Sequence, residues 1–387
     1  MTGKILRRVY NDLKQMSRGD YLETKKYLKK SLFLVRCNQK RKMKGRERIK
    51  LANQVTLTKQ QINEIRELFK SYLGKKTSLL WHKYYQSLSG SYDKRYIPEI
   101  IYAEMELLFN DSNIANAFSN KVIQHKYFVN TPGVYIPKFF AQVHEKRWYT
   151  LDMHEISIKE VAEIFQQAGR VFAKPISDSS SGIGCEIIKI IGGKESKTGL
   201  DISEFLNKYS DNYMFEEVIE CSEDISRLHP NSVNTFRIMS YRLEGEIFLC
   251  PTIMRIGRNN NEVDNAHAGG VVVALSDDGV IVSKNAVTEF NERFLKHPNT
   301  NIVFENYRIN GLGKVVSAVK SLHASIPGVG FASWDMTINK EGIPTFIEVN
   351  LISQSPWLPQ MAHGKGMFSD NTEKMLEKLK EKRQSCL

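Results

Sequence analysis

The chain has 387 residues, of which 41% are hydrophobic and 10% aromatic, and a formal net charge of +12. This length allows two or three domains around a substantial core, and the composition is typical of a globular protein. There is no run of 18 apolar residues and no apolar stretch behind the N-terminal charges, so we expect no membrane span and no export, and predict a cytoplasmic protein. The five cysteines lack zinc-site spacing and are expected to be reduced thiols.

The positive charge is concentrated at the N-terminus. Residues 1–50 contain 17 Lys or Arg and 4 Asp or Glu, a net charge of +13, against 38 and 39 in the remainder. Apolar residues at helical spacing over residues 20–35 precede a basic cluster over residues 40–48. Such a segment suits the anionic inner face of a membrane or an acidic partner, and the alternative is a solvated basic helix on the core. Nucleic-acid binding is not expected, because no DNA- or RNA-binding motif accompanies the charge.

Helical periodicity predicts helices from about Gln60 to Tyr85 and from Ile97 to Phe118. We therefore expect a basic, mainly helical N-terminal region over residues 1–95. Ser157 and Glu160 form a capping box for a helix that would end near Gly169. Strands near residues 171–174, 185–191 and 213–219, with a helix near 202–209, would form a small lid over about residues 150–222.

A strand, small-residue loop and strand span residues 171–190 within this lid. Lys174 ends the first strand, and Ser179, Ser180, Ser181 and Gly182 follow. Small residues let backbone N–H groups approach an anion, hydroxyls add donors and a lysine supplies a point charge. The segment is a candidate phosphate loop, and a mobile solvent turn is the alternative.

Turn signals at Glu244-Gly245 and at residues 277–279, followed by a helix over 312–323, predict a larger antiparallel sheet. Arg237 and Arg255 lie among apolar strand residues of this sheet. An unpaired guanidinium would be costly to bury, so each is expected to face a cleft or an acid. A polar stretch follows that could shape a substrate pocket, or form a turn before a strand, and contains Asp264, Asn265, His267, Gly269 and Gly270.

Residues 331–350 have the pattern of a β-hairpin with Glu341-Gly342 as a two-residue loop. In that register Asp335 lies opposite Glu348, and Asn350 lies two residues further on the same face. Like charges in such proximity repel, which predicts a cation between them, and oxygen ligands favour Mg²⁺ or Mn²⁺. An ordinary exposed hairpin whose acids happen to pair is the alternative. The segment from Thr372 is rich in Lys and Glu, so residues 369–387 are predicted to be a surface helix and tail.

The Lys174-Pro175 strand, the small-residue loop and the Asp335 and Glu348-x-Asn350 hairpin, in this order, resemble the ATP-grasp superfamily. Residues 231–237, 255–270, Gln360 and Gly364 resemble its sugar-transfer-associated branch, which is similar to teichuronopeptide-type ligases. The resemblance covers about residues 95–368. It implies an α+β ATP-grasp fold at 96–368, in which nucleotide binds between a small lid and a larger antiparallel-sheet subdomain.

The resemblance also implies roles for single residues. Glu216, Glu217, Val218 and Ile219 would hold adenine, and Glu223 the ribose. Lys121 resembles the first nucleotide lysine, although Asn120 replaces the usual aspartate and Lys126 competes for the role. Lys174 would contact phosphates, Asp335, Glu348 and Asn350 would hold Mg²⁺, and Arg255, with Arg237 in reserve, would stabilise the transferring phosphoryl group.

The activity implied by the family is ATP-dependent ligation of a carboxylate to an amine through an acyl phosphate. The substrates would be an amino acid and a sugar or glycan precursor in surface polysaccharide biosynthesis. Two alternatives are a phosphotransferase acting on a hydroxyl and a non-catalytic scaffold that binds glycosyltransferases through residues 1–50.

Overall fold

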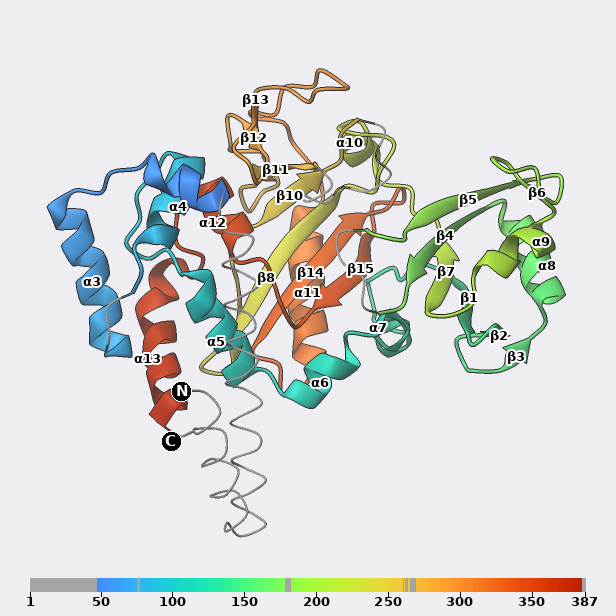
Figure 1. Ribbon diagram of the computed structural model, residues 1–387, viewed down its shortest axis with the longest axis horizontal. Coiled ribbons are helices and arrows are strands. Elements are labelled where there is room, and N and C mark those ends of the chain that lie inside the picture. The colour runs from blue at the N-terminus through green and yellow to red at the C-terminus, as the bar shows by residue number, and fades with distance from the viewer. Residues whose placement is uncertain are drawn as a thin grey trace, which may run out of the picture.

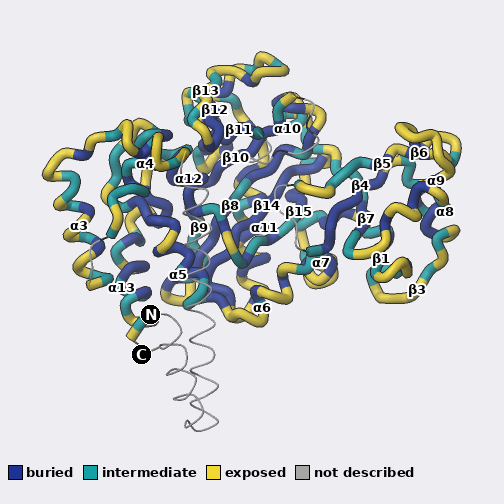
Figure 2. Tube along the Cα trace, viewed as in Figure 1, coloured by how far each residue is buried: buried dark blue, intermediate teal, exposed yellow. Residues whose placement is uncertain are grey.

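The computed structural model describes residues 47–74, 77–177, 182–259, 261, 264 and 269–384. Two antiparallel sheets lie side by side, and several helices gather at the end of the larger sheet that is remote from the smaller one (Figure 1). Buried residues concentrate along the strands of the larger sheet, whereas the loops at the outer ends are exposed (Figure 2). No helix within the described ranges is long and apolar enough to cross a membrane.

The small sheet has the strand order β3-β2-β1-β7-β4-β5-β6. Its strands are β1 (Phe139–His144), β2 (Arg147–Tyr149), β3 (Glu155–Ile156), β4 (Arg170–Pro175), β5 (Glu186–Ile191), β6 (Lys194–Glu195) and β7 (Tyr213–Glu217). The sheet begins at Phe139, earlier than the predicted lid boundary near residue 150. Helix α8 (Ile158–Ala168) packs on it through Val161 and Phe165.

Helix α8 begins and ends as its sequence predicts. The Ser157 hydroxyl accepts a hydrogen bond from the Glu160 amide, and the Glu160 carboxylate accepts one from the Ser157 amide. These two bonds satisfy N–H groups that have no partner inside the helix. Gly169 ends the helix with φ 67°.

The large sheet has the order β13-β12-β11-β10-β8-β14-β15, and β9 also pairs with β8. Its strands are β8 (Thr235–Leu243), β9 (Glu246–Leu249), β10 (Ile253–Ile256), β11 (Val271–Ala274), β12 (Ala286–Val287), β13 (Arg293–Phe294), β14 (Phe331–Ile338) and β15 (Pro344–Asn350). The predicted turn at Glu244-Gly245 is confirmed, because Leu243 pairs with Glu246.

The central strands β8 and β14 divide their residues between two faces. Phe236, Ile238, Trp334 and Met336 belong to a core shared with helix α11 (Leu312–Ser325). Alternation along each strand sends Thr235, Arg237, Ser333 and Asp335 to the opposite face. Burial of each large apolar side chain contributes roughly 1.5–3 kcal/mol, which fixes this register and therefore the polar face.

The β14–β15 hairpin differs from the predicted one in its loop. Ile338 pairs with Pro344, so the connection is five residues long rather than two, with Gly342 at φ 75°. The register then shifts between the pairs Asp335–Glu348 and Met336–Phe346, which leaves Ile347 as an extra residue. This β-bulge restores the predicted pairing of Asp335 with Glu348.

The remaining helices lie mostly around the large sheet, whereas α9 packs with α8 on the small sheet. They are α3 (Lys59–Leu73), α4 (Leu80–Ser89), α5 (Glu99–Phe109), α6 (Ser112–Ala117), α7 (Lys121–Phe128), α9 (Ile202–Phe205), α10 (Glu223–Ser226), α12 (Trp357–His363) and α13 (Thr372–Gln384), with 3₁₀ turns at Leu206–Lys208 and Ser369–Asn371.

Helix α13 is more than the surface helix that its composition suggests. Met375, Leu376 and Leu379 are fully buried in a core with residues of α3 and α5. Charged residues dominate its mean hydropathy, but the apolar ones share one side and pack there.

The N-terminal helices are held to the C-terminal part of the chain by Gln360 and Gly364. The Gln360 amide accepts from the Ile97 N–H (2.7 Å) and donates to the Ile97 carbonyl (3.1 Å). Gly364 has φ 67°, and a Cβ there would lie 2.9 Å from the Ser91 Cβ. Residues 77–95 therefore pack as part of the same body as the large sheet.

Candidate functional site

A cavity of about 860 Å³ opens between the two sheets, within the size range of small-molecule sites. The small sheet contributes residues of β4 and β5, the linker contributes residues 218–221, and the large sheet contributes β8, β10, β14 and β15. Most predicted site residues line it: Lys121, Lys174, Gly182, Glu216, Glu217, Val218, Ile219, Arg237, Arg255, Asp264, Asp335, Glu348 and Asn350.

Three predicted residues do not line this cavity. Glu223 lies in the first turn of α10, where an acid is favoured by the helix dipole. Gly269 has φ +89° and lies beside Arg258, which fits a turn before β11, and Gly270 follows it. Ser179, Ser180, Ser181, Asn265 and His267 lie outside the described residues.

Two lysines from different elements line the cavity. Lys174 is the last residue but one of β4, and its buried Nζ lies 2.5 Å from the Glu216 carboxylate on β7. Lys121 is the first residue of α7, which Asn120 caps, and its Nζ lies 3.8 Å from Glu348 Oε2. Lys126 is exposed and pairs with Asp152, so of the two competing lysines the structure places only Lys121 on the cavity wall.

The linker is fixed at both ends. The Glu217 carboxylate accepts hydrogen bonds from the Tyr135 hydroxyl and the Lys138 amide. Beyond it, the Ser222 N–H donates to the Ile338 carbonyl (2.9 Å). Among the described residues, nothing hydrogen-bonds to the backbone of Val218 or Ile219, so their N–H and C=O groups are available to a ligand in the cavity.

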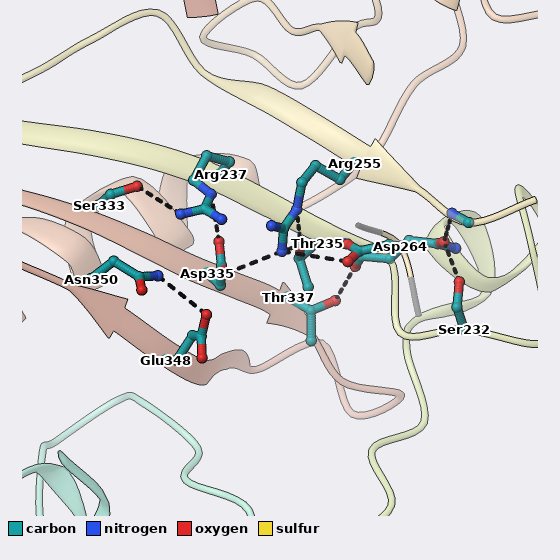
Figure 3. A network of polar contacts seen from close by, with 12 residues as sticks. Ser232, Thr235, Arg237, Arg255, Asp264, Ser333, Asp335, Thr337, Glu348 and Asn350 are labelled. Carbon is teal, nitrogen blue, oxygen red and sulfur yellow. Dashed lines mark hydrogen bonds and ion pairs between the residues drawn. The ribbon is translucent and has the colours of Figure 1, made fainter. Parts of the chain in front are cut away.

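The polar face of the large sheet carries a compact charged network (Figure 3). Arg237 lies directly opposite Asp335 in the β8–β14 register, with its Nε 2.9 Å from Asp335 Oδ1. Arg255 Nη2 lies 3.1 Å from the other Asp335 oxygen. Each arginine therefore faces both an acid and the cavity, as predicted.

The two acids of the hairpin differ in electrostatic environment. Burial raises the pKa of Asp335 to about 6, although Arg237 and Arg255 act against this. Burial would also raise the pKa of Glu348, but Lys121, Arg237 and an Asn350 hydrogen bond lower it to about 2. Glu348 thus keeps its negative charge across the physiological range.

The hairpin residues fit a divalent cation. Asp335 Oδ1 is buried and accepts no hydrogen bond from a described residue, because the nearby Arg237 Nε is close but not aligned. Glu348 offers a second carboxylate, and the Asn350 amide donates to it at 3.2 Å. The described residues contain no group of three or more His, Cys, Asp or Glu suited to a metal, so two acids and an amide would need ligand oxygens to complete coordination.

Sequence reasoning missed several cavity residues. Cys185, Ile187, Ile347, Ser353, Ser355 and Trp357 line the cavity as well. Ser353 and Ser355 follow Asn350 closely, a signal that was available. Ser353 has φ 59°, an uncommon backbone conformation for a residue with a side chain. Trp357 gave no signal, because only the packing of α12 brings it to the wall.

The two sheets, the linker and the acidic hairpin define the α+β ATP-grasp fold. The family model described as sugar-transfer associated ATP-grasp matches residues 101–375, and the chain belongs to this family. No curated protein matches the chain.

Solved structures similar to the chain are distant. They include N5-carboxyaminoimidazole synthase from Aspergillus clavatus in complex with ADP (11% identity, 63% of this chain and 47% of that one, TM-score 0.38). Two more are D-alanyl-alanine synthetase A from Vibrio cholerae (13%, 68% and 66%, 0.37) and VanG D-Ala:D-Ser ligase from Enterococcus faecalis (14%, 70% and 63%, 0.40). The chain thus spans about half to two thirds of their length.

Proposed function

We propose that this protein is an ATP- and Mg²⁺-dependent ligase that joins a carboxylate to an amine through an acyl phosphate. The observation that carries the proposal is the convergence of Lys121, Lys174, Arg237, Asp335 and Glu348 on one cavity. A magnesium nucleotide requires cations for its phosphates and acids for its metal, and this cavity holds both close together.

The base of ATP would lie against the linker. Phe172 and Ile187 of the small sheet and Ile347 of the bulge line the same cavity and would offer apolar side chains to the base. The open backbone groups of Val218 and Ile219 would hydrogen-bond its edge, and Lys174 would move from Glu216 towards the phosphates.

Asp335, Glu348 and Asn350 would hold Mg²⁺, which when bound neutralises phosphate charge. A carboxylate oxygen of the acceptor attacks the γ-phosphorus, the bond from that phosphorus to the bridging oxygen breaks, and ADP leaves. The amine then attacks the acyl carbon, the C–O bond to phosphate breaks, and the nitrogen loses a proton. No protein nucleophile takes part.

Part of the cavity lining suits a hydroxyl-rich acceptor. Asn231, Ser353 and Ser355 line the cavity, and the hydroxyls of both serines make no hydrogen bond to another described residue. Free hydroxyl and amide groups match the hydrogen bonding of sugars. Together with the family description, this supports an amino acid and a sugar or glycan precursor as the substrates. The charge of the basic N-terminus separately supports attachment of the enzyme to an anionic membrane surface.

The test is to measure ADP and phosphate release from MgATP with pools of sugar acids, amino sugars and amino acids. A ligase releases ADP and phosphate in equal amounts only when a carboxylate and an amine are both present. ADP release with a hydroxyl acceptor and no free phosphate would instead identify a phosphotransferase. Absence of nucleotide binding would favour a scaffold.

A further inference from the structure

We infer that Arg237, not Arg255, is the arginine that contacts the transferred phosphoryl group. This assignment rests on the proposed function and reverses the order of preference that the sequence suggested. It follows from counting the hydrogen-bond donors that each guanidinium still has available.

Arg255 is engaged on several sides at once. Its Nε and Nη2 both donate to the Thr235 hydroxyl, at 3.2 and 2.8 Å. Nη2 also lies 3.4 Å from an Asp264 carboxylate oxygen and 3.1 Å from Asp335 Oδ2. The Thr235 hydroxyl and amide in turn donate to the other Asp264 oxygen.

These contacts form a closed cluster. Arg255, Asp264 and Thr235 are all buried, and the acid balances the charge of the guanidinium. Turning Arg255 towards a ligand would leave the buried Asp264 carboxylate without its cation, which is strongly unfavourable. The cluster is therefore suited to holding Asp335 in place rather than to following a moving phosphoryl group.

Arg237 makes fewer hydrogen bonds to described residues than Arg255 does. Of its five N–H donors, one hydrogen-bonds to a described residue, from Nη1 to the Ser333 hydroxyl at 3.1 Å. Its Nε is buried beside Asp335 without hydrogen-bond alignment, and Nη2 hydrogen-bonds to no described side chain or carbonyl. An incomplete donor set next to the acidic hairpin, on a rigid central strand, is the arrangement that stabilises charge developing on a ligand.

The position of Arg237 agrees with this role. It lies opposite Asp335 on the neighbouring strand and on the same face of the sheet as Glu348 and Asn350 (Figure 3). A phosphoryl group held beside these metal ligands would therefore lie on the face of the sheet that carries Arg237. Arg255 approaches the same acid from the side of Asp264.

The experiment compares Arg237→Lys with Arg255→Lys, a matched pair that keeps the positive charge and removes the planar set of donors. Calorimetry measures binding of Mg·ADP alone and with aluminium fluoride, a mimic of the transferring phosphoryl group. In Arg237→Lys the tightening caused by aluminium fluoride should fall by about tenfold or more, with Mg·ADP affinity within about threefold of wild type. In Arg255→Lys any loss of affinity should be the same with and without aluminium fluoride, so the tightening should be retained, while the unfolding temperature falls.

If Arg237→Lys fails to fold, Ser333→Ala gives a second test, because Ser333 accepts the one hydrogen bond that Arg237 donates to a described residue. This variant should weaken the effect of aluminium fluoride on Mg·ADP affinity by a few fold. Equal losses in both lysine variants, loss only in Arg255→Lys, or no tightening in wild type would each overturn the assignment. The proposed reaction has a separate test. If aluminium fluoride tightens Mg·ADP binding to the wild-type protein but no acceptor pool supports ADP formation, the ligase activity is refuted and the arginine assignment stands.

Discussion

The guanidinium of Arg48 lies 4.8 Å from the ring centroid of Trp357, a residue of the cavity wall. Arg48 also lies 5.4 Å from the Tyr84 ring and pairs with the buried Glu99 carboxylate at 2.8 Å. A residue of the basic N-terminal segment therefore belongs to the core beside the site. A role in localisation alone is therefore possible only for the residues that precede Arg48.

Arg48→Ala should lower the free energy of unfolding by about 3 kcal/mol, because it removes the cation from a buried ion pair. Urea unfolding followed by tryptophan fluorescence measures this. Lys50→Ala, at an exposed position of the same segment, is the control and should change stability little. Equal stability of the two variants would contradict a core role for Arg48.

A chain that starts at residue 47 should keep ATP turnover and lose binding to anionic vesicles. The attraction is on the order of 1 kcal/mol per basic residue near the membrane and is screened by salt. Vesicle sedimentation with and without anionic lipid at low and high salt gives the result. Residues 1–46 lie outside the described structure, so this prediction rests on charge alone, and full-length protein that ignores anionic vesicles at low salt would refute it.

Glu348→Gln should reduce Mg²⁺-dependent ATP turnover by about a hundredfold or more, because a neutral amide is a weak ligand for a hard cation. Circular dichroism should show an unchanged fold. Glu341→Gln, in the exposed turn of the same hairpin, should keep full activity. Turnover in Glu348→Gln equal to that of the turn variant would remove the hairpin from the metal site.

Lys174→Ala should weaken binding of a non-hydrolysable MgATP analogue by about tenfold or more, or 1.4 kcal/mol. Lys189→Ala is the matched control, since Lys189 lies on the neighbouring strand β5 and is exposed. Because the change also leaves Glu216 buried without its cation, the unfolding temperature is measured together with calorimetry. Equal affinities of the two variants would exclude Lys174 from the nucleotide site.

His323 should make the fold sensitive to acid. Its ring is buried between the Ser240 hydroxyl (2.7 Å) and the Val329 carbonyl (3.0 Å), and burial lowers its pKa from 6.5 to about 4. Between these values the unfolded chain binds more protons than the folded one, so stability is full above pH 6.5 and falls as the pH decreases. The loss at pH 5 from this group is about 2 kcal/mol, at 1.36 kcal/mol per pKa unit.

Urea titrations of wild type and His323→Gln at pH 7 and pH 5 isolate this contribution. Other buried histidines with pKa values near 4, His82 and His363, remain in both proteins and cancel in the comparison. The variant should lose about 2 kcal/mol less than wild type over this interval. An identical pH dependence would show that His323 titrates normally.

Local patterns in the sequence were sufficient for many elements and for part of the site. The Ser157–Glu160 cap, the Glu244-Gly245 turn and the facing of Asp335 and Glu348 each depend on residues close together in the chain. Their geometry follows from backbone preference and side-chain alternation, which a single sequence displays. In the β14–β15 hairpin, however, the five-residue loop shifts the pairing register, and the bulge at Ile347 restores the pairing of Asp335 with Glu348. The local sequence pattern predicted neither the longer loop nor the bulge.

Contacts between distant residues were decided only by the tertiary structure. The pairing of Arg237 and Arg255 with Asp335, the position of Arg48 beside Trp357 and the bonding of Gln360 to Ile97 join segments roughly 80 to 310 residues apart. Periodicity shows which side of a strand or helix is buried, but not which other segment covers it. Which segments pack together depends on the burial of the whole core. This packing surrounds Arg255 with hydrogen-bond partners and leaves Arg237 with donors that a ligand can use.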